Sequence, residues 1–182
     1  VAPPNGEALR SQIAACEQRW SIKVGPPFPD LSYHWVAPAT LADGTRAVLK
    51  IGAPHPELSS EIEALRRYDG RGAVRLLAAD AERGALLLER AMPGRRLADL
   101  DDDRATEIAA DLMRDLWQPG DGFRALEDWT QAIVRAPPSA MIAEATAVRA
   151  ELLASSDPIL LHADLHHDNM LSAERRPWLA ID

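Results

Sequence analysis

The sequence predicts an α+β protein with a strand-rich first part and a helical second part. Most of the strand-like runs, separated by turn residues, lie before Met92-Pro93-Gly94. From Asp101 onward, the apolar residues recur at helical spacing instead. A Pro-Gly pair between two such stretches marks a joint, because both residues interrupt regular structure. We therefore expect an N-terminal part at 1–92, built on an antiparallel sheet with a helix, and a mainly helical part at 93–182.

The first part begins with a predicted helix at 6–19, where apolar residues share one face. Glycine and prolines at 25–29 then break the chain. Two strand-like runs follow, at 33–37 and 46–51, on either side of Asp43-Gly44. Asp-Gly between such runs indicates a hairpin, because glycine adopts the positive φ that a tight turn requires.

A second helix and a second hairpin complete the first part. Residues 56–68 have helical spacing, and Ser60 with Glu63 fits an S-x-x-E capping box near the start of this helix. The runs at 74–79 and 85–90 predict the second hairpin.

The second part is predicted to start with a helix entered through three aspartates at 101–103. Its apolar stripe consists of Ala105, Ile108, Leu112 and Leu116. The remaining predicted elements are helices near 123–134 and 140–154, a short apolar strand at 159–161 and a final hairpin that ends at 182.

The amino-acid composition indicates which kinds of binding partner and cellular environment suit the protein. The net charge of −8 argues against a nucleic-acid partner and is compatible with a small cationic substrate. Apolar runs are only a few residues long, so we expect no membrane-spanning segment. Cys16 is the single cysteine, which excludes an internal disulfide and favours the reducing cytoplasm. Nothing in the sequence indicates the oligomeric state.

The strongest chemical signal is the segment HADLHHDN at 162–169, which follows an apolar run. It contains H-x-D-x-x-x-x-N, the catalytic-loop pattern of kinases. Asp164 is placed to orient an attacking hydroxyl and accept its proton. If the loop curls, Asn169 reaches a metal ion on the phosphates, and Asp182 supplies a second ligand to the same ion.

A second signal is Lys50, at the end of the apolar run AVLK, where its ammonium could meet the α- and β-phosphates of ATP. Glu61 and Glu63 on the next helix are both candidates to pair with it. Glu61 shares a stripe with apolar Leu65 and Tyr68, whereas Glu63 lies near two arginines on the solvent side. A carboxylate on the buried side requires a cationic partner, which favours Glu61.

A metal-dependent hydrolase is an alternative interpretation of the loop, because three histidines and two aspartates lie within HADLHHD. That interpretation leaves Lys50 and the buried-side Glu61 unexplained.

Lys50, Glu61, HADLHHDN and Asp182 occur in an order that resembles aminoglycoside phosphotransferases and related small-molecule kinases. The chain is most similar to the group of streptomycin 6-kinases and hydroxyurea-resistance kinases. The likeness covers nearly the whole chain. The segments that carry it include GPPFP, WVAPATLADGTRAVLKIG, RGALLLER and LLHADLHHDN…PWLAID.

The resemblance implies a protein-kinase-like fold of two lobes and transfer of the γ-phosphoryl group of ATP to a hydroxyl, with magnesium as cofactor. It implies a streptomycin-type aminoglycoside as acceptor and a role in antibiotic resistance. Lys50 would hold the phosphates, Glu61 would fix Lys50, and Asp164 would be the catalytic base. The other implied roles are adenine contacts by backbone groups of Arg90 and Met92, magnesium binding by Asn169 and Asp182, and shaping of the loop by His162.

Some features depart from the family pattern. Ala163 stands where the family usually has glycine, and His167-Asp168 replaces a Pro-Gly-like pair. Ala163 is tolerated if its φ is negative. The chain ends at Asp182, so the second lobe is expected to be incomplete at its C-terminus. A kinase of another small alcohol and a non-catalytic ATP-binding pseudokinase are the further alternatives.

Overall fold

The computed structural model describes residues 6–29, 34–155 and 157–181, which form two compact units. The first unit comprises Val1–Leu116 and His162–Asp182, and the second comprises Trp117–Leu161. The chain combines helices with antiparallel sheets, so the predicted α+β class is confirmed. The predicted lobes at 1–92 and 93–182 are a different partition and stay a prediction.

The first unit contains a five-stranded antiparallel sheet in the order β1-β2-β3-β5-β4. Its strands are β1 (Ile22–Val24), β2 (Trp35–Leu41), β3 (Arg46–Ile51), β4 (Leu76–Asp80) and β5 (Ala85–Glu89). Both predicted hairpins are present. The β2–β3 turn contains Gly44 at a φ of +88°, and a short 3₁₀ helix (Ala81–Arg83) joins β4 to β5. Residues 30–33, where the sequence placed the start of β2, lie outside the described residues.

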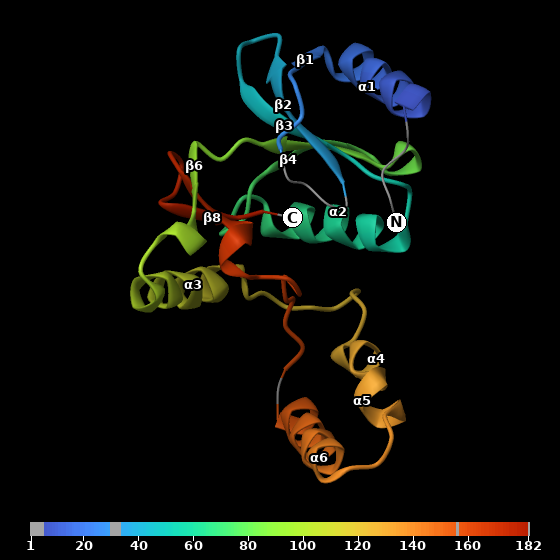
Figure 1. Cartoon of the computed structure of the whole chain (residues 1–182), viewed down its shortest axis with the longest axis vertical. Helices are drawn as coiled ribbons and strands as arrows, with labels where there is room; N and C mark the ends of the chain where they lie inside the picture. Colours follow the sequence, from blue (N-terminus) through green and yellow to red (C-terminus); the bar gives the residue numbers. More distant parts are fainter. Residues whose placement is uncertain (1–5, 30–33, 156, 182) are drawn as a thin grey trace. The chain divides into compact units, whose positions relative to one another are not determined.

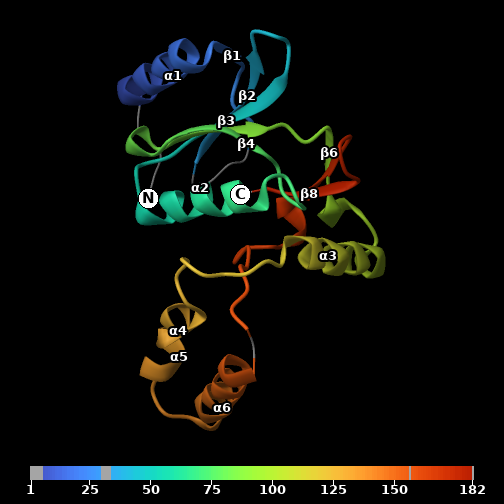
Figure 2. The same ribbon diagram turned by 180° about the vertical axis from the view of Figure 1, so that it is seen from behind.

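Two helices lie on opposite sides of this sheet, α1 (Gly6–Trp20) and α2 (Pro56–Tyr68) (Figures 1 and 2). α1 packs on the side that carries Ala47, Leu49 and Ile51, all fully buried. The alternation of β3 therefore places Val48 and Lys50 on the side of α2. The buried stripe of α2 consists of Leu58, Ile62, Leu65 and Tyr68.

α2 spans the predicted residues, but the predicted capping box at its start is wrong. The N-cap is His55, whose Nδ1 accepts a hydrogen bond from the amide of Glu57 at 3.3 Å. Pro56 occupies the first turn, where its missing N–H costs no hydrogen bond. The helix therefore begins before Ser60, which leaves Ser60 and Glu63 inside it.

A three-stranded sheet in the order β6-β7-β8 completes the first unit. The elements of this region are β6 (Pro93–Arg96), β7 (Met170–Ala173), β8 (Trp178–Ala180), α3 (Asp102–Leu116) and two 3₁₀ helices (Leu97–Asp99 and His167–Asn169). The predicted final hairpin is β7–β8. Its strand β8 is hydrogen-bonded to the segment that follows α2, because the amide of Ala180 donates to Gly72 O at 2.8 Å and that of Val74 to Ala180 O at 3.0 Å.

The second unit contains α4 (Leu126–Trp129), α5 (Gln131–Arg135) and α6 (Ala140–Ser155). The predicted helix near 123–134 is thus two short helices. The predicted strand at 159–161 is wrong, since Ile159 forms only an isolated bridge with Pro119. Ile159 and Leu161 are exposed on either side of buried Leu160. Within the described parts of the chain, no helix has the length and apolar character needed to cross a bilayer.

Candidate active site

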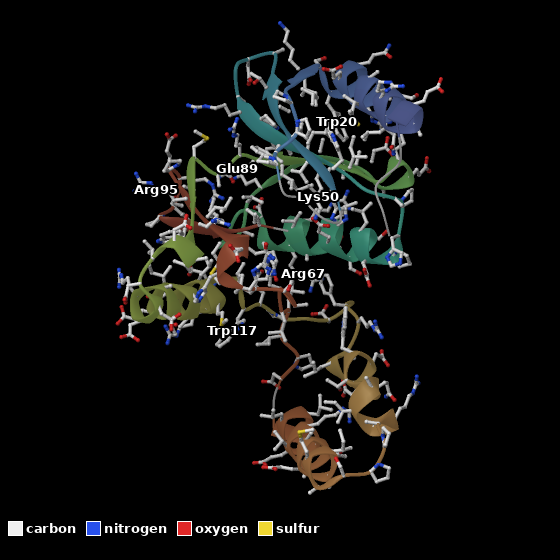
Figure 3. The ribbon with its side chains drawn as sticks, viewed as in Figure 1. Trp20, Lys50, Arg67, Glu89, Arg95 and Trp117 are labelled. Carbon is white, nitrogen blue, oxygen red and sulfur yellow. The ribbon has the colours of Figure 1, made fainter. Side chains whose placement is uncertain are left out.

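The buried centre of the candidate site is an ion pair between β3 and α2. Lys50 Nζ lies 2.9 Å from Oε1 and 3.1 Å from Oε2 of Glu61. Lys50 is only 4% exposed, so its charge is stabilised chiefly by neighbouring groups rather than by water. Figure 3 labels Lys50 between the strands of the sheet and α2. The pairing with Glu61 that the sequence favoured is present, whereas Glu63 is exposed and lies 3.9 Å from Arg66.

An apolar surface adjoins this ion pair, and we call it the Lys50 face of the sheet. Strand register places six side chains on it: Val36, Pro38, Val48, Lys50, Leu86 and Leu88. Leu86 is fully buried and Leu88 nearly so, whereas Val36, Pro38 and Val48 are only partly buried. Residues of α1 pack against the opposite face. Partly exposed apolar residues beside a buried ammonium fit a ligand with an aromatic ring and an anionic group.

The joint between β5 and β6 borders the same surface. Arg90 follows β5, and its guanidinium lies over the ring of Phe28, with Cζ 5.6 Å from the ring centroid. Phe28 belongs to the segment after β1, where its amide donates to Val36 O at 2.9 Å. The sequence predicted a backbone role for Arg90 and Met92 but missed Phe28. The GPPFP segment was a signal, because its prolines restrict the chain on both sides of the aromatic ring.

The loop at 162–169 curls as the sequence analysis required. The amide of His166 donates to Asp164 O at 3.0 Å, and that of Asn169 donates to His166 O at 2.9 Å. Asn169 Nδ2 lies 3.0 Å from Asp164 O and 3.4 Å from Asp164 Oδ2. The side chain of Asp164 is 76% exposed, so its carboxylate is accessible to a substrate. The predicted base and the predicted amide ligand therefore lie side by side.

The end of the described chain is attached to this loop. His162 Nε2 lies 3.1 Å from Ile181 O, and the amide of Ile181 donates to Asn169 O at 2.9 Å. His162 thus contacts the backbone, and its role in shaping the loop stays a prediction. Asp182, the other predicted metal ligand, lies outside the described residues.

Several titratable and charged side chains lie close together in the loop and beside it. His166 lies 3.8 Å from a carboxylate oxygen of Asp164 and 3.8 Å from one of Asp168. Arg96 lies 3.3 Å from Asp168. Even so, no group of three or more His, Cys, Asp or Glu side chains in the described ranges is arranged to hold a metal.

Ala163 has a φ of +70°, a conformation that favours glycine. Alanine was expected to be tolerated here if its φ were negative, and the observed φ is positive. Ala163 is exposed, so its methyl group gains little packing in return. We expect Ala163→Gly to raise the free energy of unfolding by about 0.5–1 kcal/mol, after the greater chain entropy of glycine is subtracted from the relieved strain. Urea unfolding measures the change.

A matched control for this substitution is Ala14→Gly, at an exposed position inside α1. There the free energy of unfolding should fall by about 1 kcal/mol, because glycine is a poor helix former. A decrease for Ala163→Gly as well would contradict the strain at Ala163.

Several known proteins are similar in sequence to this chain. Residues 19–182 match the family described as aminoglycoside/hydroxyurea antibiotic resistance kinase. The chain is 39% identical to a streptomycin 6-kinase of Streptomyces griseus, over 96% of the chain and 61% of that protein. It is 37% identical to a hydroxyurea phosphotransferase of Kitasatospora aureofaciens, over 97% of the chain and 56% of that protein. A streptomycin 3''-kinase of Klebsiella pneumoniae is 35% identical, over 91% of the chain and 64% of that protein. The chain thus spans less than two thirds of the length of these relatives.

Proposed function

The chain belongs to the aminoglycoside/hydroxyurea antibiotic resistance kinase family, and from this premise we propose that the protein is an ATP-dependent phosphotransferase acting on a hydroxyl of a small molecule. The observation that carries the proposal is the ion pair of buried Lys50 with partly buried Glu61, beside a partly open apolar sheet face. An ammonium held at such a place suits the phosphates of a nucleotide whose base lies on the apolar residues. The kinase-like division into lobes at 1–92 and 93–182 is part of the same proposal.

Each residue has a separate task in the proposed reaction. Lys50, fixed by Glu61, binds the α- and β-phosphates of ATP. Asp164 orients the acceptor hydroxyl and accepts its proton, while the hydroxyl oxygen bonds to the γ-phosphorus and the bond to the β–γ bridging oxygen breaks. Asn169 and Asp182 would hold magnesium, which neutralises charge on the phosphates when it is bound. Because little covalent chemistry is required of the protein, positioning supplies much of the rate.

For the acceptor we propose an aminoglycoside of the streptomycin type. Two observations support a small cationic acceptor: the net charge of −8, and relatives named as streptomycin kinases. The hydroxyurea phosphotransferase among the relatives makes hydroxyurea the second acceptor to examine.

The base of the nucleotide is proposed to lie beside the joint, contacting backbone groups of Arg90 and Met92, with Phe28 closing the pocket. Phe28→Ala removes the ring on which Arg90 lies. We expect it to raise the KM for ATP about threefold, the size of a partly exposed cation–π contact, and to leave kcat nearly unchanged. Steady-state kinetics with varied ATP measures both constants. Phe28→Tyr keeps the ring and should behave like the wild type; equal KM values for all three proteins would contradict a contact with the base.

The function itself is tested by ADP release from the complete protein with magnesium and ATP, in separate reactions with streptomycin, with hydroxyurea and without acceptor. Streptomycin-dependent ADP release, with the mass of one phosphoryl group added to streptomycin, is the expected result. Tight binding of magnesium-ATP without turnover would favour another hydroxyl acceptor or a pseudokinase. Neither turnover nor nucleotide binding would contradict the proposal.

A further inference from the structure

One arginine of the β7–β8 turn makes more hydrogen bonds than its place in the sequence suggests. Arg175 Nε lies 2.8 Å from Glu89 Oε1, and its Nη2 lies 2.8 Å from Glu89 Oε2. The same guanidinium donates to Gly70 O at 2.7 Å and to Ala73 O at 3.0 Å. We call these four residues the Arg175 network. A single planar cation thus binds one carboxylate with both oxygens and two carbonyl groups.

The network joins three parts of the candidate site. Glu89 ends β5 and immediately precedes Arg90 at the joint. Gly70 and Ala73 lie in the segment that follows α2, the helix that carries Glu61. Arg175 itself belongs to the hairpin that begins directly after Asn169. One side chain therefore connects the end of β5, the segment that follows α2 and the hairpin that follows the catalytic loop.

The local backbone is shaped to accept this guanidinium. Gly70 has a φ of +75°, and a Cβ there would lie 2.8 Å from Arg75 Cγ and 3.2 Å from Arg175 Nη2. Any larger residue at this position would displace one of the two arginines. The amide of Arg75 also donates to Glu89 Oε2 at 3.0 Å, and the amide of Glu89 donates to Arg75 O at 2.8 Å. The segment after α2 is thus bound to β5 on one side and to the hairpin on the other.

The Arg175–Glu89 ion pair is mostly shielded from water, which favours a rigid connection between the parts that it joins. The side chains of Arg175 and Glu89 are only 23% and 20% exposed, so water screens them weakly. Burial alone would raise the pKa of Glu89, but the hydrogen bonds from Arg175 and from the Arg75 amide outweigh it and hold that pKa below its ordinary value. Lysine cannot replace this arrangement, because an ammonium is a point charge without the planar fork of arginine.

We infer that Arg175 is a positioning residue: it sets the place of the Lys50–Glu61 pair relative to the loop that carries Asp164 and Asn169. This inference rests on the proposed function for its catalytic consequence. Transfer of a phosphoryl group requires the two halves of the site to be aligned, and a displacement of about 1 Å can reduce a rate by about 10²-fold. Loss of the network should therefore lower kcat more than it affects binding of the acceptor.

The test compares Arg175→Lys with Arg176→Met in the complete protein. Arg176 is the adjacent residue, and its ion pair with Asp115, at 2.7 Å, is half exposed. We expect Arg175→Lys to remain folded, to lose about tenfold or more in kcat and to keep the KM of the acceptor, whereas Arg176→Met should match the wild type. Unchanged kcat in Arg175→Lys would overturn the positioning role.

A second measurement separates this inference from the proposed function. Spin labels at Glu63 on α2 and Ser172 on β7, with buried Cys16 replaced by alanine, report the distance between the two sides without any catalysis. The distance distribution should broaden in Arg175→Lys and stay narrow in Arg176→Met. Equal widths in both variants would overturn the inference even in an active enzyme. A broadened distribution in a protein that neither binds nor uses ATP would support the positioning role and contradict the proposed function.

Discussion

Replacing Asp164 by asparagine is expected to reduce kcat by about 10²- to 10⁴-fold and to leave the affinity for magnesium-ATP nearly unchanged. The expected loss is that of a general base, because asparagine cannot accept the proton of the acceptor hydroxyl. The loop should keep its shape, because His166 N and Asn169 Nδ2 bond to the backbone oxygen of Asp164. The side chain is 76% exposed, so the substitution opens no cavity.

Single-turnover kinetics and titration with magnesium-ATP separate the two effects in the complete protein. Asp168→Asn is the matched control, since Asp168 is an exposed carboxylate of the same loop. It should retain turnover, although it loses charge next to Arg96 and His166. If Asp164→Asn instead abolished nucleotide binding and retained no measurable structure in the loop, Asp164 would not be primarily the base.

The elements whose signals lie within a short stretch of sequence could be predicted from that sequence. α2 begins and ends at the predicted residues because its apolar stripe is regular, Pro56 is suited to its first turn and Asp69 caps its end. The same stripe separated Glu61 from Glu63, since periodicity alone tells which carboxylate faces the core. Lys50 and Glu61 could therefore be paired from sequence although they lie on different elements.

Features that depend on distant contacts were not predictable in the same way. The apolar run at 159–161 resembles a strand, yet its pairing with residues 118–120 does not extend beyond the isolated Pro119–Ile159 bridge. Arg175 stands in a polar turn, where an arginine is usually solvated; its acceptors at Gly70, Ala73 and Glu89 are remote in sequence. The φ of Ala163 likewise follows from the path of the loop and not from the residue itself.

The second prediction with a large expected effect concerns the Lys50–Glu61 ion pair, whose loss should change both the stability and the activity of the protein. Glu61→Leu is expected to lower the free energy of unfolding by about 3 kcal/mol, because Lys50 is 4% exposed and loses both oxygens that accept its hydrogen bonds. Glu63→Leu on the same helix should change it by less than about 0.5 kcal/mol, since Glu63 is exposed. Urea unfolding of both variants measures the contrast.

The double variant Lys50→Met/Glu61→Leu distinguishes a pair retained for stability from one retained for chemistry. Apolar side chains of similar volume remove the buried charge of Lys50 and the partly buried charge of Glu61 at once, so the free energy of unfolding should return to within about 1 kcal/mol of the wild type. Turnover should still fall by about 10²-fold or more, because no ammonium is left to bind the phosphates. A double variant that is stable and fully active would show that Lys50 does not hold the nucleotide. Stability restored without activity would mean that the ion pair is maintained at the cost of a buried charge because the reaction requires it.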